Sequence, residues 1–126
     1  MDTLAIYFLL VTAQYNLPPH MLESVCWVES KHKITAIHKN DGDSDSLGVC
    51  QIKLKTAKWL GFKGNSEELM DPENNIKYAG KYLAKQINRY KGNTKKAVIA
   101  YNRGNAKELT VSNYQVKVFK QMGDFQ

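Results

Sequence analysis

A single carboxylate inside an apolar helical stripe constrains this chain more than any other feature. The residues Leu22, Val25, Cys26 and Glu29 follow the i, i+3, i+4, i+7 spacing of one helix face. This spacing directs the side chain of Glu29 toward the core. Because burial raises the pKa of a Glu above its usual value of about 4.3, a carboxyl placed here can hold a proton near neutral pH. Such a group suits general acid catalysis, and the alternative is a Glu at a fraying helix end that turns back to water.

Length and composition indicate one globular domain that covers residues 1–126. A chain of 126 residues can bury one core and is too short for two ordinary domains. Hydrophobic residues make up 43% of the chain and charged residues 24%, which excludes a disordered or fibrous protein. The seven Tyr and two Trp suit a surface that binds polar ligands, such as carbohydrate, through flat apolar faces.

The charge balance favours a polyanionic partner. The formal net charge of +6 fits nucleic acid, anionic lipid or an anionic cell wall. Specific readers of duplex DNA rely on Arg for bidentate base contacts, and this chain has only Arg89 and Arg103. We therefore expect no nucleic-acid partner.

The apolar run from Leu4 to Val11 resembles a targeting signal only superficially. It lacks a basic segment before it, because Asp2 is the only charge there, and it is much shorter than the 18 or more residues of a membrane span. We expect a buried first helix, no membrane insertion and no export signal.

The two cysteines, Cys26 and Cys50, follow no zinc-binding or redox spacing. Each stands among apolar neighbours, where a thiol acts as a small buried hydrophobe. A disulfide would require their Cα atoms to approach within about 7 Å. We expect free thiols.

Hydrophobic periodicity predicts a mainly α chain with a short hairpin between Ile34 and Ile52. The expected helices are Thr3–Tyr15, Pro19–Lys31, Lys55–Leu60, Pro72–Tyr90, a helix from Thr94 to Gly104, and Ser112–Met122. In the first helix, Ile6, Leu9, Leu10 and Ala13 should face the core, and in the third Trp59 should lie on the apolar side. We expect Asp71 and Thr94 to cap the helices that they precede or begin, and close helix packing at Gly80.

Three aspartates gather in the loop before Ser46. Asp41, Asp43 and Asp45 alternate with Gly and Ser, which is typical of a loop. An EF-hand would need a Gly and a terminal Glu at offsets that this loop lacks. We expect neither a metal ion nor a cofactor.

Four blocks in order carry a resemblance to a known family. They are Glu29-Ser30, then Gly48-Val49-Cys50-Gln51, then Asn75-Ile76 with Gly80 and Tyr82-Leu83, and finally Ala100-Tyr101-Asn102 with Gly104. From Tyr7 onward the chain resembles the lytic transglycosylase domain of the soluble (SLT) type, a relative of goose-type lysozyme. The Val49-Cys50 pair replaces the family's Leu-Met, and Arg103 stands where the family often has a small residue.

The resemblance implies a lysozyme-like, mainly α fold with a groove for the glycan strands of peptidoglycan. Glu29 matches the family's catalytic acid, which protonates the oxygen between N-acetylmuramic acid and N-acetylglucosamine. The same carboxylate would then accept the proton of the muramoyl C6 hydroxyl while that oxygen attacks C1 and closes a 1,6-anhydro ring. A second catalytic carboxylate is then unnecessary.

The resemblance also assigns groove positions. Ser46 and Gln51 match residues that line the family's groove. Tyr101 matches the tyrosine that faces the catalytic Glu, and its hydroxyl could form a hydrogen bond with the carboxyl of Glu29. Asn102 is a further expected substrate contact. Asn75 and Asn102 can equally be structural.

Two other functions remain open at this point. A goose-type hydrolase of the same fold would use Asp41, Asp43 or Asp45 as a base that positions water, if one lies about 6.5–9.5 Å from Glu29. A non-catalytic wall-binding module would keep the groove without turnover. The family implies action on the bacterial cell wall after delivery by phage lysis, a virion or secretion machinery, and we expect a monomer.

Overall fold

The computed structural model describes residues 2–41, 44–106 and 112–126, except for the side chains of residues 40 and 41. Within these residues the protein consists of seven helices and a small sheet. In chain order the elements are α1 (Thr3–Gln14), α2 (Met21–Ser30), β1 (Ile37–Asp41), β2 (Ser44–Leu47), β3 (Ile52–Lys53), α3 (Leu54–Trp59), α4 (Ser66–Met70), α5 (Pro72–Arg89), α6 (Thr94–Arg103) and α7 (Asn113–Phe125). The mainly α prediction is confirmed.

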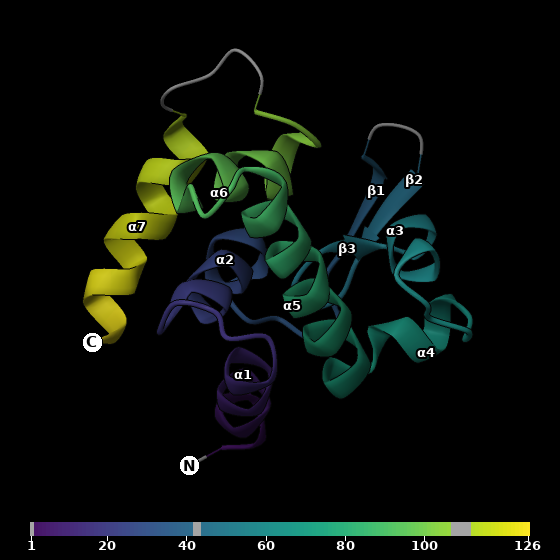
Figure 1. The fold of residues 1–126 in the computed structure, drawn as a ribbon. Coiled ribbons are helices and arrows are strands. Elements are labelled where there is room, and N and C mark those ends of the chain that lie inside the picture. The colour runs from purple at the N-terminus through teal and green to yellow at the C-terminus, as the bar shows by residue number, and fades with distance from the viewer. Residues whose placement is uncertain (1, 42–43, 107–111) are drawn as a thin grey trace.

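The long helix α5 forms the centre of the fold. It contacts α1, α4, α6 and the sheet, and Figure 1 shows the sheet with α3 and α4 on one side of it and α2 with α7 on the other. Leu22, Val25, Ile76, Leu83 and Val98 are completely buried around it. Each such side chain contributes about 1.5–3 kcal/mol through removal from water.

Close packing at Gly80 fixes α1 against α5, as predicted. A methyl group at Gly80 would meet Cγ1 of Val11 and approach Cδ2 of Leu22. Because the helices touch there, no larger residue fits without displacing one of them.

The predicted inward face of α1 is wrong. Ile6, Leu9 and Leu10 are 42%, 56% and 62% exposed, whereas Phe8 and Val11 are buried. The helix is apolar nearly all round, so its periodicity could not select a face. The contact of Val11 with Gly80 selects it instead.

Three helix details also differ from the sequence prediction. Helix α2 begins at Met21 after His20, whose φ of 65° is left-handed, and so does not start at Pro19. Asn93 caps α6 through a bond from the Lys96 amide, in place of Thr94. Trp59 does not face the core, since it is 67% exposed.

Helix α4 was not predicted. Its first turn is closed by a capping box in which Asn65 Oδ1 accepts from the Glu68 amide (2.8 Å) and Glu68 Oε1 accepts from the Asn65 amide (3.0 Å). The Asn-x-x-Glu signature of such a box is present in the sequence.

The predicted hairpin is formed by β1 and β2, and β3 adds a third antiparallel strand in the order β1-β2-β3. Ser46 pairs with His38 on one side and Lys53 on the other. The sheet thus holds Ser46 at the centre of three strands, where its position is fixed from both sides.

Candidate active site

Helix α2 delivers Glu29 one residue before its C-terminal end. The helix is anchored by Leu22, Val25 and Cys26, all fully buried, and Glu29 is half-buried one turn beyond Cys26. This is the face that the apolar stripe predicted. The next residue, Ser30, donates its hydroxyl to the Val49 carbonyl (2.6 Å) and so ties the helix end to the following loop.

The hydroxyl of Tyr114 donates a 2.7 Å hydrogen bond to Oε2 of Glu29. The resemblance had given this role to Tyr101. The Tyr101 hydroxyl instead donates to the Cys50 carbonyl (2.9 Å). No local pattern in the sequence indicates Tyr114, because the bond depends on the packing of α7 against α2.

Burial keeps both tyrosines in their neutral form. Desolvation, followed by the negative charge of Glu29, raises the pKa of Tyr101 and of Tyr114 well above the usual 10.0. The bond to the carboxyl raises the pKa of Tyr114 further. Tyr114 therefore remains a hydrogen-bond donor to Glu29 across the neutral and mildly alkaline range.

The side chain of Asn75 holds the loop 48–51 in place through three hydrogen bonds to the backbone. Its side chain accepts from the Cys50 amide (2.8 Å) and donates to the carbonyls of Leu47 and Leu69 (both 2.9 Å), and it is fully buried. A Cβ at Gly48, where φ is +78°, would collide with this amide. The structure therefore assigns Asn75 a structural role.

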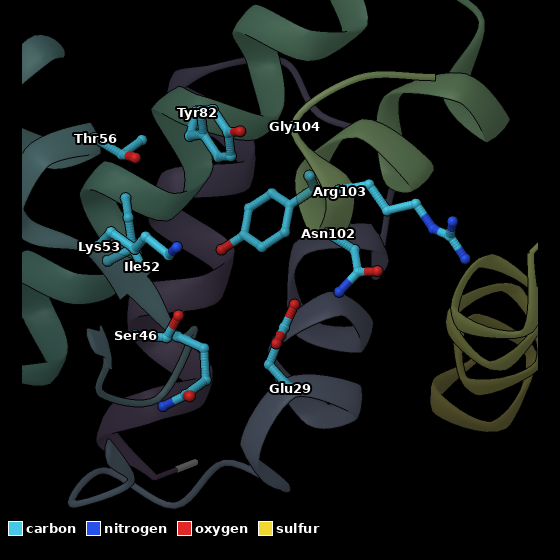
Figure 2. Close-up of a pocket in the computed structure, with 11 residues that line it drawn as sticks. Glu29, Ser46, Ile52, Lys53, Thr56, Tyr82, Asn102, Arg103 and Gly104 are labelled. Carbon is cyan, nitrogen blue, oxygen red and sulfur yellow. The ribbon is translucent and has the colours of Figure 1, made fainter. Parts of the chain in front are cut away.

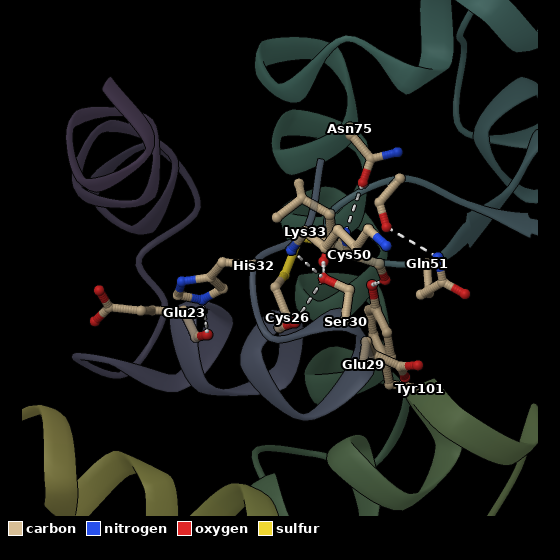
Figure 3. Close-up of a disulfide and its surroundings, with 12 residues drawn as sticks. Glu23, Cys26, Glu29, Ser30, His32, Lys33, Cys50, Gln51, Asn75 and Tyr101 are labelled. Carbon is tan, nitrogen blue, oxygen red and sulfur yellow. Dashed lines mark hydrogen bonds between the residues drawn. A yellow bond between two sulfur atoms is a disulfide. The ribbon is translucent and has the colours of Figure 1, made fainter. Parts of the chain in front are cut away.

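Cys26 and Cys50 form a disulfide, with their Cα atoms 4.2 Å apart. The expectation of free thiols is wrong. Both were correctly predicted to be buried, but the sequence does not show that the loop folds back onto α2. The bond joins the helix that carries Glu29 to the loop whose carbonyl receives the hydroxyl of Tyr101 (Figure 3).

Glu29 lines a pocket of about 260 Å³ together with all four predicted groove residues, Ser46, Gln51, Tyr101 and Asn102. Ser46 is buried, and Gln51 is held by bonds from its Nε2 to the carbonyls of Ala36 (3.1 Å) and Gly48 (3.0 Å). Figure 2 shows Glu29 below Asn102 and across the pocket from Ser46. Residues from α2, β2, α6 and the loop before β3 thus converge on one depression.

Other lining residues had no predicted role in substrate binding. They are Ile52, Lys53, Thr56, Tyr82, Arg103 and Gly104. Lys53 and Arg103 give the pocket wall two cations beside one carboxylate. Figure 2 shows the guanidinium of Arg103 directed away from Glu29.

Asp45 lies at a different depression, which it lines with Ile37, Lys39, Leu47 and Glu67 among others. Successive residues of a strand point to opposite faces, so Asp45 and Ser46 face apart. The side chain of Asp41 and all of Asp43 fall outside the described residues. The described residues include no group of three or more His, Cys, Asp or Glu side chains that could hold a metal ion.

Comparison with known protein families agrees with this arrangement of the site and covers almost the whole chain. A family model described as the Transglycosylase SLT domain matches residues 7–121. The chain belongs to this family. The SLT domain is 34% identical over 108 residues to the peptidoglycan transglycosylase gp16 of Escherichia phage T7, covering 83% of this chain and 8% of gp16. It is also 33% identical over 93 residues to the protein IpgF of Shigella flexneri, covering 72% of this chain and 60% of IpgF.

The fold of the SLT domain recurs in a solved structure. An inactive mutant of the lytic transglycosylase Slt from Pseudomonas aeruginosa superposes with a TM-score of 0.72 at 18% identity, over 96% of this chain and 22% of that one. This likeness confirms the lysozyme-like fold. The SLT domain spans less than two thirds of the curated relatives named above. Within the described part of the chain, every helix is too short or too polar to cross a membrane.

Proposed function

We propose that this SLT domain cleaves the β-1,4 bond between N-acetylmuramic acid and N-acetylglucosamine in peptidoglycan, with Glu29 as the single general acid and base. The observation that carries the proposal is the bond from Tyr114 to Glu29 at the wall of the pocket. Among the described residues, Glu29 is the only carboxylate on that wall. The phage T7 relative, a peptidoglycan transglycosylase, supports the substrate class.

In the first step the protonated carboxyl of Glu29 gives its proton to the glycosidic oxygen. Tyr114 donates to Oε2 and orients the carboxyl, which lines the pocket and presents the proton there. The bond from muramoyl C1 to that oxygen breaks, and the N-acetylglucosamine side leaves with the proton. An acid that lines a depression can meet the glycosidic oxygen of a bound strand at hydrogen-bond distance.

In the second step the ionised Glu29 accepts the proton of the muramoyl C6 hydroxyl. The C6 oxygen then attacks C1 and closes the 1,6-anhydro ring, which restores the protonated carboxyl. Tyr114 stabilises the intermediate carboxylate because hydrogen bonds to ionised groups are stronger than neutral ones. Glu29 thus serves both steps without water as a nucleophile.

The sugar on either side of the bond is proposed to contact Ser46, Gln51 and Asn102, whose polar groups suit acetamido and hydroxyl groups. Tyr101 would act through its ring, because its hydroxyl is committed to Cys50. Lys53 would attract the carboxylates of the peptide stems.

Product analysis on purified sacculi tests the proposal. We expect mass spectrometry to detect soluble muropeptides with 1,6-anhydromuramic acid. The Glu29→Gln variant should fold like the wild type and release none of these products. Glu23→Gln is the matched control, since Glu23 lies on the same helix, pairs with His20 (3.1 Å) and does not line the pocket. Reducing-end muramic acid would indicate a hydrolase, and strand binding without any product would indicate a wall-binding module.

We also propose the biological setting, for which the phage T7 relative supports a role in phage. The domain would act as a monomer on the bacterial cell wall after delivery by phage lysis, a virion or secretion machinery. The net charge of +6 would favour adsorption to an anionic wall.

A further inference from the structure

Trp59 is exposed to an extent that its size does not explain. The side chain is 67% exposed at the last position of α3, while its neighbours Ala57 and Leu60 are buried. A large aromatic surface left in water is costly for a folded protein, and such surfaces mark binding sites when other features converge on them.

The indole is held in place by a cation. The Nζ of Lys85 lies 4.8 Å from the centroid of the Trp59 ring. A cation at this distance is attracted to the ring face and restricts the side chain. One face of the ring is therefore occupied by Lys85, and the high exposure leaves the opposite face open.

Trp59 and Lys85 continue the two helices that border the Glu29 pocket. Thr56 on α3 and Tyr82 on α5 line the pocket, and Trp59 and Lys85 each follow three residues later. Side chains at i and i+3 are neighbours on a helix surface, about 5 Å apart along the axis. The pair thus lies one turn beyond the pocket wall on both helices at once.

We propose that Trp59 forms an outer sugar subsite, in which its open face stacks on an N-acetylhexosamine ring farther along the strand bound at Glu29. The apolar face of a sugar ring fits a flat indole, whose rigidity lowers the entropy lost on binding. Lys85 acts as a positioning residue that holds the indole. This inference rests on the proposed function for the choice of strand and adds no chemical step.

The proposal predicts an effect that grows with strand length. Short fragments that fill only the pocket do not reach Trp59, whereas long strands do. Trp59→Ala should therefore weaken binding of long strands about tenfold, as expected for one aromatic contact, and leave the shortest fragments unaffected.

Binding can be measured separately from turnover. In Glu29→Gln combined with Trp27→Phe, Trp59 is the only tryptophan left of two. Trp27 contacts the rings of His32 and Phe125 and does not line the pocket, so its loss should not alter strand binding. Titration with peptidoglycan oligosaccharides of increasing length should change the Trp59 fluorescence only for the longer members.

Trp59→Ala and Trp59→Tyr are compared with Lys58→Ala, a control that removes an exposed cation from the same helix. We expect a length-dependent loss of affinity for Trp59→Ala, partial recovery for Trp59→Tyr and near wild-type affinity for Lys58→Ala. Equal affinity of Trp59→Ala and wild type at every length would overturn the subsite while leaving the proposed function intact. Length-dependent binding by an otherwise inactive wild type would support the subsite and refute the proposed function.

Discussion

Tyr114 and Glu29 are 85 positions apart in the sequence, yet the tyrosine hydroxyl lies 2.7 Å from the carboxylate of the glutamate. The contact depends on α7, which packs along α2 at the edge of the fold (Figure 1). The last helix therefore does more than complete the core, because it fixes the rotamer of the proposed acid.

Tyr114→Phe should lower kcat about tenfold to hundredfold with little change in KM. The ring still packs, but Glu29 loses the donor that orients it, and positioned proton transfer contributes roughly 10²–10⁴-fold. Steady-state turnover of labelled sacculi measures the effect. Tyr101→Phe serves as the contrast, since it frees the Cys50 carbonyl and should reduce stability more than kcat. Equal loss of kcat in both variants would contradict separate roles for the two hydroxyls.

Stability should fall at alkaline pH. The pKa values of Tyr101 and Tyr114 are raised in the folded state above the unfolded value of about 10, so the fold binds these protons more tightly. The contribution of these two tyrosines to the free energy of unfolding is fully present below pH ~10. It is lost as the pH rises above this value toward their folded-state pKa values. Urea unfolding from about pH 8 to 11 measures the trend, which Tyr101→Phe should weaken. A midpoint that stays constant over that range would refute it.

Reduction of the disulfide should destabilise the domain by about 3.5 kcal/mol, the loop-closure value for a loop of about 25 residues. The sequence separation of Cys26 and Cys50 is 24. Thermal unfolding with and without dithiothreitol measures the loss, and the variant with both cysteines changed to Ala should show no response to the reductant. Activity should fall as well, because the bond holds α2 against the loop that contacts Tyr101. A Tm that is the same in both conditions would contradict the prediction.

Gly48→Ala should cost more stability than Gly92→Ala. Both glycines have left-handed φ, +78° and +86°, so both substitutions carry the backbone penalty of about 1 kcal/mol. Only Gly48 has a neighbour, because a methyl group there would collide with Asn75, whereas the space at Gly92 is open. We expect about 2–4 kcal/mol at Gly48, with displacement of the loop beside Gln51. Chemical denaturation of the two variants measures the difference, and equal losses would show that Asn75 can move aside.

The sequence identified the residue types and their local placement. The apolar stripe at Leu22, Val25 and Cys26 predicted that Glu29 would reach the interior, because helical periodicity is a local property. The start of α5 at Pro72 and the close approach at Gly80 were predicted for the same kind of reason, from the backbone chemistry of single residues. The family blocks then placed Ser46, Gln51, Tyr101 and Asn102 beside Glu29, and the structure brings all four to its pocket.

Only the tertiary structure decided which partners these residues have. Tyr114, and not Tyr101, donates the hydrogen bond to the carboxyl of Glu29, and Cys26 forms a disulfide with Cys50. Leu9, Leu10 and Trp59 are exposed to solvent. Each of these outcomes depends on contacts between segments far apart in the chain or on the choice among equally apolar faces. Local periodicity carries no information about either, so the packing of whole helices had to settle them.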